Sequence, residues 1–237
     1  MFKIDLRSRA SVIALLNHYM KHGQRGSHIP RWMGRKFGKY PIDAMIYQSV
    51  LWHTQPDILI ETGTWHGGSA QYFADIMTLL GNGRVISVDI TNDNPPSPLP
   101  EHPRVSFISG SSIDPLVLEQ LRAIIQSEPE AKVMVVLDSD HTHQHVLQEL
   151  ELYAPLVSPN MYLVVEDVEK NIYFRFLRAM VALLENRPVS QHGRVGAKGA
   201  MAEYLQNHPD VFTQTTIGTR AMFSQQPTGW LQKKAAV

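Results

Sequence analysis

Residues 58–69 read ILIETGTWHGGS, and this stretch decides the fold. It begins with an unbroken apolar run, which is typical of a strand buried on both faces of a parallel sheet. A glycine-rich turn follows, and Gly68–Leu80 then has the length and composition of a helix. The stretch therefore predicts a strand–turn–helix unit in an α/β sheet.

The same alternation continues along the chain, with apolar runs that end at polar residues and helix-like segments after several of them. The expected strands are Ile58–Gly63, Arg84–Ile90, Val105–Gly110, Val133–Asp140 and Met161–Val168. The helices expected between them are Gly68–Leu80, Asp114–Gln126 and Thr142–Leu156. Right-handed crossovers then give a Rossmann-like α/β fold with a mostly parallel sheet.

The two ends of the chain depart from this pattern. Helices are expected at Asp5–Lys21 and Ile42–His53, with a loop at Gly23–Tyr40 between them. The C-terminal part predicts helices at Phe174–Glu185 and Ala200–Asn207, then an antiparallel hairpin of Thr213–Ile217 with Ala221–Gln225. We therefore expect a helical N-terminal extension and lid at residues 1–56 and one structural unit at residues 57–237.

The composition excludes several classes of protein. The 237 residues include 22 Lys and Arg, 22 Asp and Glu, and no Cys. A formal charge of zero gives no bulk attraction to nucleic acid or to an anionic membrane, so we expect neither as a partner. The lack of Cys excludes disulfides, thiolate metal sites and a cysteine nucleophile. Without a long apolar run or a signal peptide, the chain is expected to be cytoplasmic.

The glycine-rich turn follows an acidic residue, Glu61, and reads GxxxGG rather than GxGxxG. An acid there disfavours a pyrophosphate and favours a ligand that carries an ammonium group. The next strand ends at Asp89, whose carboxylate could accept hydrogen bonds from ribose hydroxyls. The alternative is a tight turn beside two surface acids. An acid, a glycine turn and a second acid in this order resemble the class I S-adenosylmethionine (SAM) methyltransferases.

Carboxylates also stand where the fourth and fifth expected strands end. Asp138 and Asp140 would project from one face if the strand reached that far. Asp140, Glu166 and Asp167 would then meet at one edge of the sheet, where they would repel one another unless a cation neutralised them. Oxygen ligands favour Mg²⁺, with Mn²⁺ or Ca²⁺ as alternatives. A solvated acidic edge without a metal is the alternative interpretation.

Histidines lie close to these acids in the sequence. His143 comes three residues after Asp140, and an imidazole there could accept a proton from a metal-bound hydroxyl. His141 and His145 are alternatives, and a solvent-facing histidine at a helix start is the ordinary interpretation. Asp138 is expected to contact the cofactor or to support the metal ligands.

Three segments together resemble the cephalosporin hydroxylase family. They are Lys39–Ala70, which includes KYPID and ILIETGTWHGGSA, then LDSDHTH at 137–143 and VVED at 164–167. The family has a methyltransferase fold and is similar to macrolide-sugar and rhamnosyl O-methyltransferases. The resemblance implies that Glu61, Gly63, Gly68 and Asp89 contact SAM, that Asp140, Glu166 and Asp167 hold Mg²⁺, and that His143 is the general base. The segment His192–Gly199 departs from the family pattern.

These observations predict a Mg²⁺-dependent SAM O-methyltransferase that acts on a hydroxyl of a small molecule, such as a sugar or a natural product. The expected catalytic residues are Asp140 and His143. The expected cofactor-binding residues are Glu61, Gly63, Thr64, Gly67, Gly68, Ser69, Asp89 and Asp138. Two alternatives stay open, a hydroxylase-like oxygenase component and a non-catalytic module that binds SAM and metal. A homo-oligomer is also expected.

Overall fold

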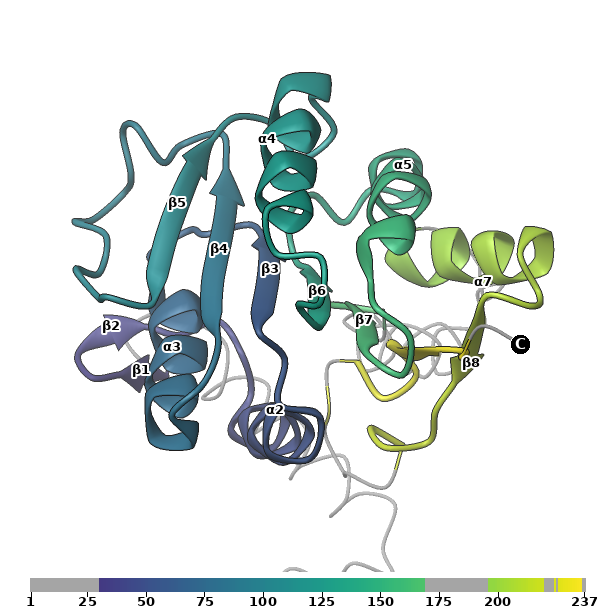
Figure 1. The fold of residues 1–237 in the computed structure, drawn as a ribbon, viewed down its shortest axis with the longest axis horizontal. Helices are drawn as coiled ribbons and strands as arrows, with labels where there is room; N and C mark the ends of the chain where they lie inside the picture. Colours follow the sequence, from purple (N-terminus) through teal and green to yellow (C-terminus); the bar gives the residue numbers. More distant parts are fainter. Residues whose placement is uncertain (1–29, 169–195, 220–223, 225, 236–237) are drawn as a thin grey trace, which may run out of the picture.

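The computed structural model describes residues 30–168, 196–219, 224 and 226–235 (Figure 1). The helices expected at Asp5–Lys21 and Phe174–Glu185 lie outside these residues, as does the first part of His192–Gly199. Within the described ranges, no helix combines the length and the apolar character that a crossing of a membrane requires.

The centre of the fold is a seven-stranded sheet with the order β5-β4-β3-β6-β7-β9-β8. Its parallel strands are β3 (Ile58–Thr62), β4 (Arg84–Asp89), β5 (Val105–Ser109), β6 (Val133–Leu137) and β7 (Tyr162–Val165). The antiparallel strands are β9 (Trp230–Lys233) and β8 (Phe212–Gln214). The chain order reverses between β3 and β6, which is the point where open α/β sheets bind ligands. The predicted Rossmann-like arrangement is confirmed.

Helices cover both faces of this sheet (Figure 1). One layer contains α2 (Pro41–Thr54) and α3 (Gly68–Leu80), and the other contains α4 (Pro115–Gln126), α5 (His143–Tyr153) and α7 (Ala197–Asn207). A 3₁₀ turn, η1 (Ala154–Leu156), follows α5. A separate hairpin of β1 (Arg31–Trp32) and β2 (Arg35–Lys36) lies beside α3 (Figure 1).

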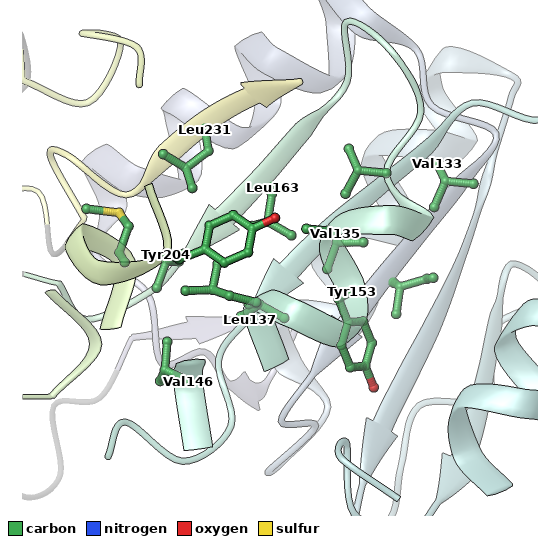
Figure 2. Close-up of a cluster of buried hydrophobic side chains, with 14 of the residues drawn as sticks. Val133, Val135, Leu137, Val146, Tyr153, Leu163, Tyr204 and Leu231 are labelled. Carbon is green, nitrogen blue, oxygen red and sulfur yellow. The ribbon is translucent and has the colours of Figure 1, made fainter. Parts of the chain in front are cut away.

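The apolar runs of the strands divide between the two layers. Leu59, Met134 and Val164 pack towards α2 and α3, whereas their sequence neighbours pack towards α4, α5 and α7. Figure 2 shows the second cluster, in which β6, β7 and β9 meet helices α5 and α7; it labels Val133, Val135, Leu137, Val146, Tyr153, Leu163, Tyr204 and Leu231. Burial on both faces explains why these strands lack polar alternation.

Two local predictions were wrong, and a third is confirmed in its coarser form. β6 ends at Leu137 rather than at Asp140, because Leu137 is the last residue of β6 that pairs with both neighbouring strands. The predicted C-terminal antiparallel hairpin is present as β8 paired with Trp230–Lys233, and most of the strand expected at Ala221–Gln225 lies outside the described residues. The expected loop at Gly23–Tyr40 contains the β1–β2 hairpin. Its turn residues, Met33 and Gly34, have φ of 46° and 84°, as a tight hairpin turn requires.

The described part of the N-terminal extension shares the core of the sheet. Tyr47, Val50 and Leu51 of α2 are buried in the same cluster as Phe73 of α3. The boundary at residue 56 stays a prediction, and residues 1–29 lie outside the described chain.

Candidate active site

A pocket of about 840 Å³ lies at the carboxyl ends of the parallel strands. Gly63 and Ser69 of the glycine-rich turn line it together with Asp89, which ends β4. Asp138 and Asp167, which follow β6 and β7, line the same pocket. The sequence predicted three groups separately: the glycine-rich turn, Asp89, and the acidic edge after β6 and β7. Residues of all three line this one cavity.

The glycine-rich turn passes between two backbone segments that leave no room for side chains. Gly63 has φ of +89°, and a Cβ atom there would lie 2.0 Å from the carbonyl oxygen of Asp138. A Cβ atom on Gly68 would lie 2.0 Å from the carbonyl oxygen of Lys36. Gly67, at the N-cap of α3, has φ of +70°. The positive φ favours glycine at Gly63 and Gly67, and the lack of space for a Cβ atom requires it at Gly63 and Gly68.

Glu61 is a buried carboxylate behind this turn. Its Oε2 accepts a hydrogen bond of 2.8 Å from the hydroxyl of Ser87, which also contacts Thr64 at 2.7 Å. Its Oε1 is buried and makes no hydrogen bond of ordinary geometry among the described residues, although the nearby Ser69 hydroxyl favours the ionised form, and Glu61 itself is not among the residues that line the pocket. Burial raises the pKa of Glu61 to about 7, against the opposing charge of Lys39. A buried acceptor without a well-formed hydrogen bond suits a bound ammonium group, which would satisfy the oxygen and neutralise it.

Asp89 is held at the pocket by hydrogen bonds from Trp65 and Thr91. Its Oδ2 accepts a hydrogen bond of 3.1 Å from the backbone N–H of Trp65. Its Oδ1 accepts bonds from the backbone N–H and the hydroxyl of Thr91, at 2.8 and 2.7 Å. A carboxylate oxygen has two lone-pair sites, so Oδ2 can accept a further donor such as a ribose hydroxyl.

Strand register brings two acids together at the other side of the pocket. Leu137 of β6 pairs with Val165 of β7, so the residues that follow them, Asp138 and Glu166, stand side by side. The ammonium of Lys39 lies between them, 2.8 Å from an oxygen of each. Burial alone would lower the pKa of Lys39, but the carboxylates of Asp138 and Glu166 raise it above its ordinary value. Burial raises the pKa of Glu166, and the charge of Lys39 opposes this.

Three side chains at this edge form a candidate cation site. Single ligand atoms from Asp138, His141 and Asp167 all lie within 4.8 Å of one another. The Nε2 atom of His141 is 2.8 Å from Oδ2 of Asp167 and 3.9 Å from Oδ1 of Asp138. Two carboxylates with an adjacent imidazole suit a divalent cation.

This trio differs from the metal ligands expected from the sequence. Asp140 lines the pocket but is exposed, and its Oδ1 accepts a hydrogen bond of 2.9 Å from the backbone N–H of Thr142. Because β6 ends at Leu137, Asp138 rather than Asp140 stands level with Glu166. Glu166 itself is bonded to Lys39. Of the expected ligands, only Asp167 belongs to the trio.

The expected base, His143, points to another part of the fold. Its Nε2 lies 3.2 Å from Oε2 of Glu203 in α7, and it is not among the pocket residues. His141 and His145 do line the pocket. Since β6 ends three residues early, His143 already belongs to α5 and follows that helix away from the acids.

Several residues of the site were missed by sequence reasoning. Lys39 was expected in the resemblance motif KYPID and in the lid segment at residues 31–40, but not between two carboxylates, and Asp138 and His141 were not expected to meet at a cation site. Behind the pocket, the Oε1 atom of Glu149 accepts a hydrogen bond of 2.7 Å from Ser139 and lies 3.7 Å from His145. The nearby carboxylate of Glu149 raises the pKa of His145, and partial burial opposes this. The sequence signal was the spacing of four between His145 and Glu149 on one helix face.

The β1–β2 hairpin lies at one side of the pocket and the loop after β4 at the other, where Lys36 and Asn94 are among the lining residues. Arg35 joins the two, because its guanidinium donates hydrogen bonds to the carbonyl oxygens of Pro98 and Leu99. The ammonium of Lys36 lies 5.7 Å from the centre of the Trp65 ring. This arrangement is compatible with the expected lid.

Comparison with known proteins assigns the chain to a family. The profile of the rhamnosyl O-methyltransferase/CmcI family matches residues 25–234. The chain belongs to this family. The rhamnosyl O-methyltransferase of Mycobacterium bovis (strain BCG / Pasteur 1173P2) is 40% identical over 141 residues, which is 59% of this chain and 57% of the relative. That of Mycobacterium leprae (strain TN) is 39% identical over 141 residues, 59% of this chain and 61% of the relative. The match thus spans less than two thirds of the length of these relatives.

Solved structures show the same fold. A structure of CmcI with Mg and SAM has a TM-score of 0.64 at 20% identity, over 92% of this chain and 84% of that one. The MycE methyltransferase from the mycinamycin biosynthetic pathway, in complex with Mg, SAH and mycinamycin VI, has a TM-score of 0.51 at 16% identity, over 94% of this chain and 54% of that one. The resemblance seen in the sequence and the class I methyltransferase fold are therefore confirmed.

Proposed function

We propose that the protein is a Mg²⁺-dependent SAM O-methyltransferase whose substrate is a hydroxyl of a sugar or of a sugar-bearing natural product. The observation that carries the proposal is the single pocket lined by the glycine-rich turn, by Asp89 and by the acids Asp138 and Asp167. The mycobacterial relatives named as rhamnosyl O-methyltransferases support the reaction and the sugar. The MycE complex with Mg, SAH and a macrolide supports the metal and the class of acceptor.

The cofactor end of the pocket fits SAM. The buried Oε1 atom of Glu61 would accept the ammonium group of the methionine part. Asp89 would accept the ribose hydroxyls. The turn of Gly63, Thr64, Gly67, Gly68 and Ser69 lets the backbone approach the ligand closely. SAM supplies an electrophilic methyl group, so the task of the protein is to bring a hydroxyl oxygen into line with it.

The acidic edge fits a divalent cation. Asp138 and Asp167 would hold Mg²⁺ with Glu166 beside them, and Mn²⁺ or Ca²⁺ suit the same oxygens. When bound, the ion stabilises negative charge on the acceptor oxygen and so makes the hydroxyl easier to deprotonate. Asp140 is exposed and its Oδ1 accepts the backbone N–H of Thr142, so it is not placed with Asp138 and Asp167.

His141 is our candidate for the general base. It lines the pocket, and its Nε2 contacts Asp138 and Asp167. In this role His141 is not a metal ligand: with the ion on the two carboxylates, its Nε2 would take the proton of a hydroxyl bound at this edge. The contact of His143 with Glu203 argues against the base expected from the sequence.

The chemistry of the trio also bears on the oxygenase alternative. Non-haem iron oxygenases typically use two histidines and one carboxylate, whereas the trio has one histidine and two carboxylates. This ratio favours a hard cation such as Mg²⁺. A measurement of turnover distinguishes the enzyme from the alternative of a non-catalytic module.

The test is methyl transfer from SAM to a panel of rhamnosides and macrolide sugars, followed by mass spectrometry. We expect a methylated product with Mg²⁺, none after EDTA treatment, and recovery when Mg²⁺ is restored. Tight SAM binding without transfer to any acceptor would favour the non-catalytic module, and transfer in EDTA would remove the metal from the proposal. Light scattering tests the proposed homo-oligomer, and a cytoplasmic location stays part of the proposal.

A further inference from the structure

Lys39 is a buried cation that the proposed reaction does not use. Its side chain is 2% exposed, and its Nζ atom lies 2.8 Å from Oδ2 of Asp138 and 2.8 Å from Oε1 of Glu166. The rings of Tyr47 and Phe73 lie 5.5 and 6.0 Å from this atom. A cation enclosed in this way by two carboxylates and two aromatic rings is fixed in place.

Its two partners are each held by one oxygen. On Glu166, the donors Lys39, Tyr47 and Gln226 all bond to Oε1, and none of these bonds reaches Oε2. On Asp138, Lys39 bonds to Oδ2, while Oδ1 is the oxygen that lies 3.9 Å from His141. The ammonium thus fixes one oxygen of each carboxylate, and on Asp138 it leaves Oδ1, the oxygen beside His141, for a ligand.

The segment that carries Lys39 is itself tightly packed. Gly68 lies so close to this segment that a Cβ atom there would be 2.0 Å from the carbonyl oxygen of Lys36 and 3.2 Å from the Cα atom of Phe37. The chain between the β1–β2 hairpin and α2 is therefore packed against the cofactor turn. The position of Lys39 is set by that contact and not by the acids alone.

We propose that Lys39 is a positioning residue for the cation site, which ties Asp138 to Glu166 through one oxygen of each so that Oδ1 of Asp138 is presented to the metal ion. Without the ammonium, the partly buried carboxylate of Asp138 and the buried carboxylate of Glu166 repel each other and lose this orientation. The inference rests on the proposed function and deepens it, because it names the residue that prepares the site before the ion arrives.

The chain offers a clean test because it contains no Cys. Lys39→Cys removes the ammonium, and alkylation of the unfolded variant with 2-bromoethylamine, then refolding, restores an ammonium on a side chain of nearly the same length. Lys39→Gln is the second variant, because Gln retains hydrogen-bond donors without the charge. Mn²⁺ binding is measured by electron paramagnetic resonance, SAM binding by calorimetry, and folding by circular dichroism.

We expect Lys39→Cys and Lys39→Gln to weaken Mn²⁺ binding by about tenfold or more, as loss of a partner of metal ligands does elsewhere. Aminoethylation should restore the affinity of Lys39→Cys, and SAM affinity should change much less than Mn²⁺ affinity. Mn²⁺ binding by folded Lys39→Gln that equals or exceeds that of the wild type would overturn the proposal. So would a failure of aminoethylation to restore binding in refolded protein. If the wild type bound no Mn²⁺, the metal in the proposed function would fail as well, a result distinct from an unchanged variant.

Discussion

Gly63 and Asp138 are in backbone contact, since a Cβ atom on Gly63 would lie 2.0 Å from the carbonyl oxygen of Asp138. The cofactor turn is thereby fixed against the end of β6. Gly63→Ala must move one of these segments and also places Ala at φ of +89°. We expect the free energy of unfolding to fall by about 2 kcal/mol or more, and SAM binding to weaken. Denaturant unfolding and calorimetry measure the two effects.

Gly81→Ala is the matched control for that prediction. Gly81 has φ of +77°, but no heavy atom lies within 4 Å of a Cβ atom there. This substitution should therefore cost only the backbone conformational penalty, about 1 kcal/mol, with SAM binding unchanged. Equal losses in both variants would mean that the contact with Asp138 is unimportant.

Glu61→Gln tests the buried carboxylate through the pH dependence of stability. Burial raises the pKa of Glu61 from 4.5 to about 7, so ionisation of Glu61 costs the folded state free energy that is absent below pH 4.5 and grows until about pH 7. Gln carries no such cost. The stability of the variant relative to the wild type should therefore rise by up to about 3 kcal/mol between these pH values. Denaturant unfolding at pH 4.5 and pH 8 measures the difference.

The same variant should lose affinity for SAM even where it gains stability. A neutral amide cannot pair with an ammonium group as a carboxylate does, so we expect a loss of about tenfold or more at pH 8. Unchanged SAM affinity would show that Glu61 does not contact the ammonium group.

Asp138→Asn and Asp140→Asn distinguish the two candidate metal ligands. Asp138 belongs to the trio with His141 and Asp167, whereas Asp140 is exposed and accepts a hydrogen bond from Thr142. We expect Asp138→Asn to weaken Mn²⁺ binding by about tenfold or more and to abolish most turnover. Asp140→Asn should leave Mn²⁺ affinity nearly unchanged. The reverse ranking would restore the ligand set expected from the sequence.

His141→Asn and His143→Asn distinguish the two candidate bases. Loss of a general base lowers kcat by about a hundredfold or more, and we expect this only for His141→Asn. His143→Asn should keep kcat and lose only the contact with Glu203, which joins α5 to α7. Steady-state kinetics at saturating SAM and Mg²⁺ measure both variants.

The fold was predictable because its strongest signal is local. Each buried strand is a short apolar run, and residues such as Glu61 and Asp89 mark the ends of these runs. The alternation of strands and helices predicts a mostly parallel sheet with right-handed crossovers, and the order of its strands comes from the structure. The hairpin at Met33–Gly34 was not predicted, since Met33 stands where Asn, Asp or Gly usually precedes the turn glycine.

The details of the site depended on long-range contacts instead. Whether Asp138 or Asp140 faces Glu166 depends on where β6 ends, and its pairing with β3 and β7 fixes that point at Leu137. Lys39 lies 99 residues from Asp138 and 127 residues from Glu166 in the sequence, so no local pattern joins them. A single chain without aligned relatives gives no sign of such a contact.

The hydrogen bonds of Arg35 to the carbonyl oxygens of Pro98 and Leu99 have a consequence for how the border of the pocket can move. They tie the hairpin to the loop after β4, so these two segments at the border of the pocket can move apart only when the hydrogen bonds of Arg35 break. A side chain outside the proposed chemistry therefore couples the positions of two segments that border the pocket.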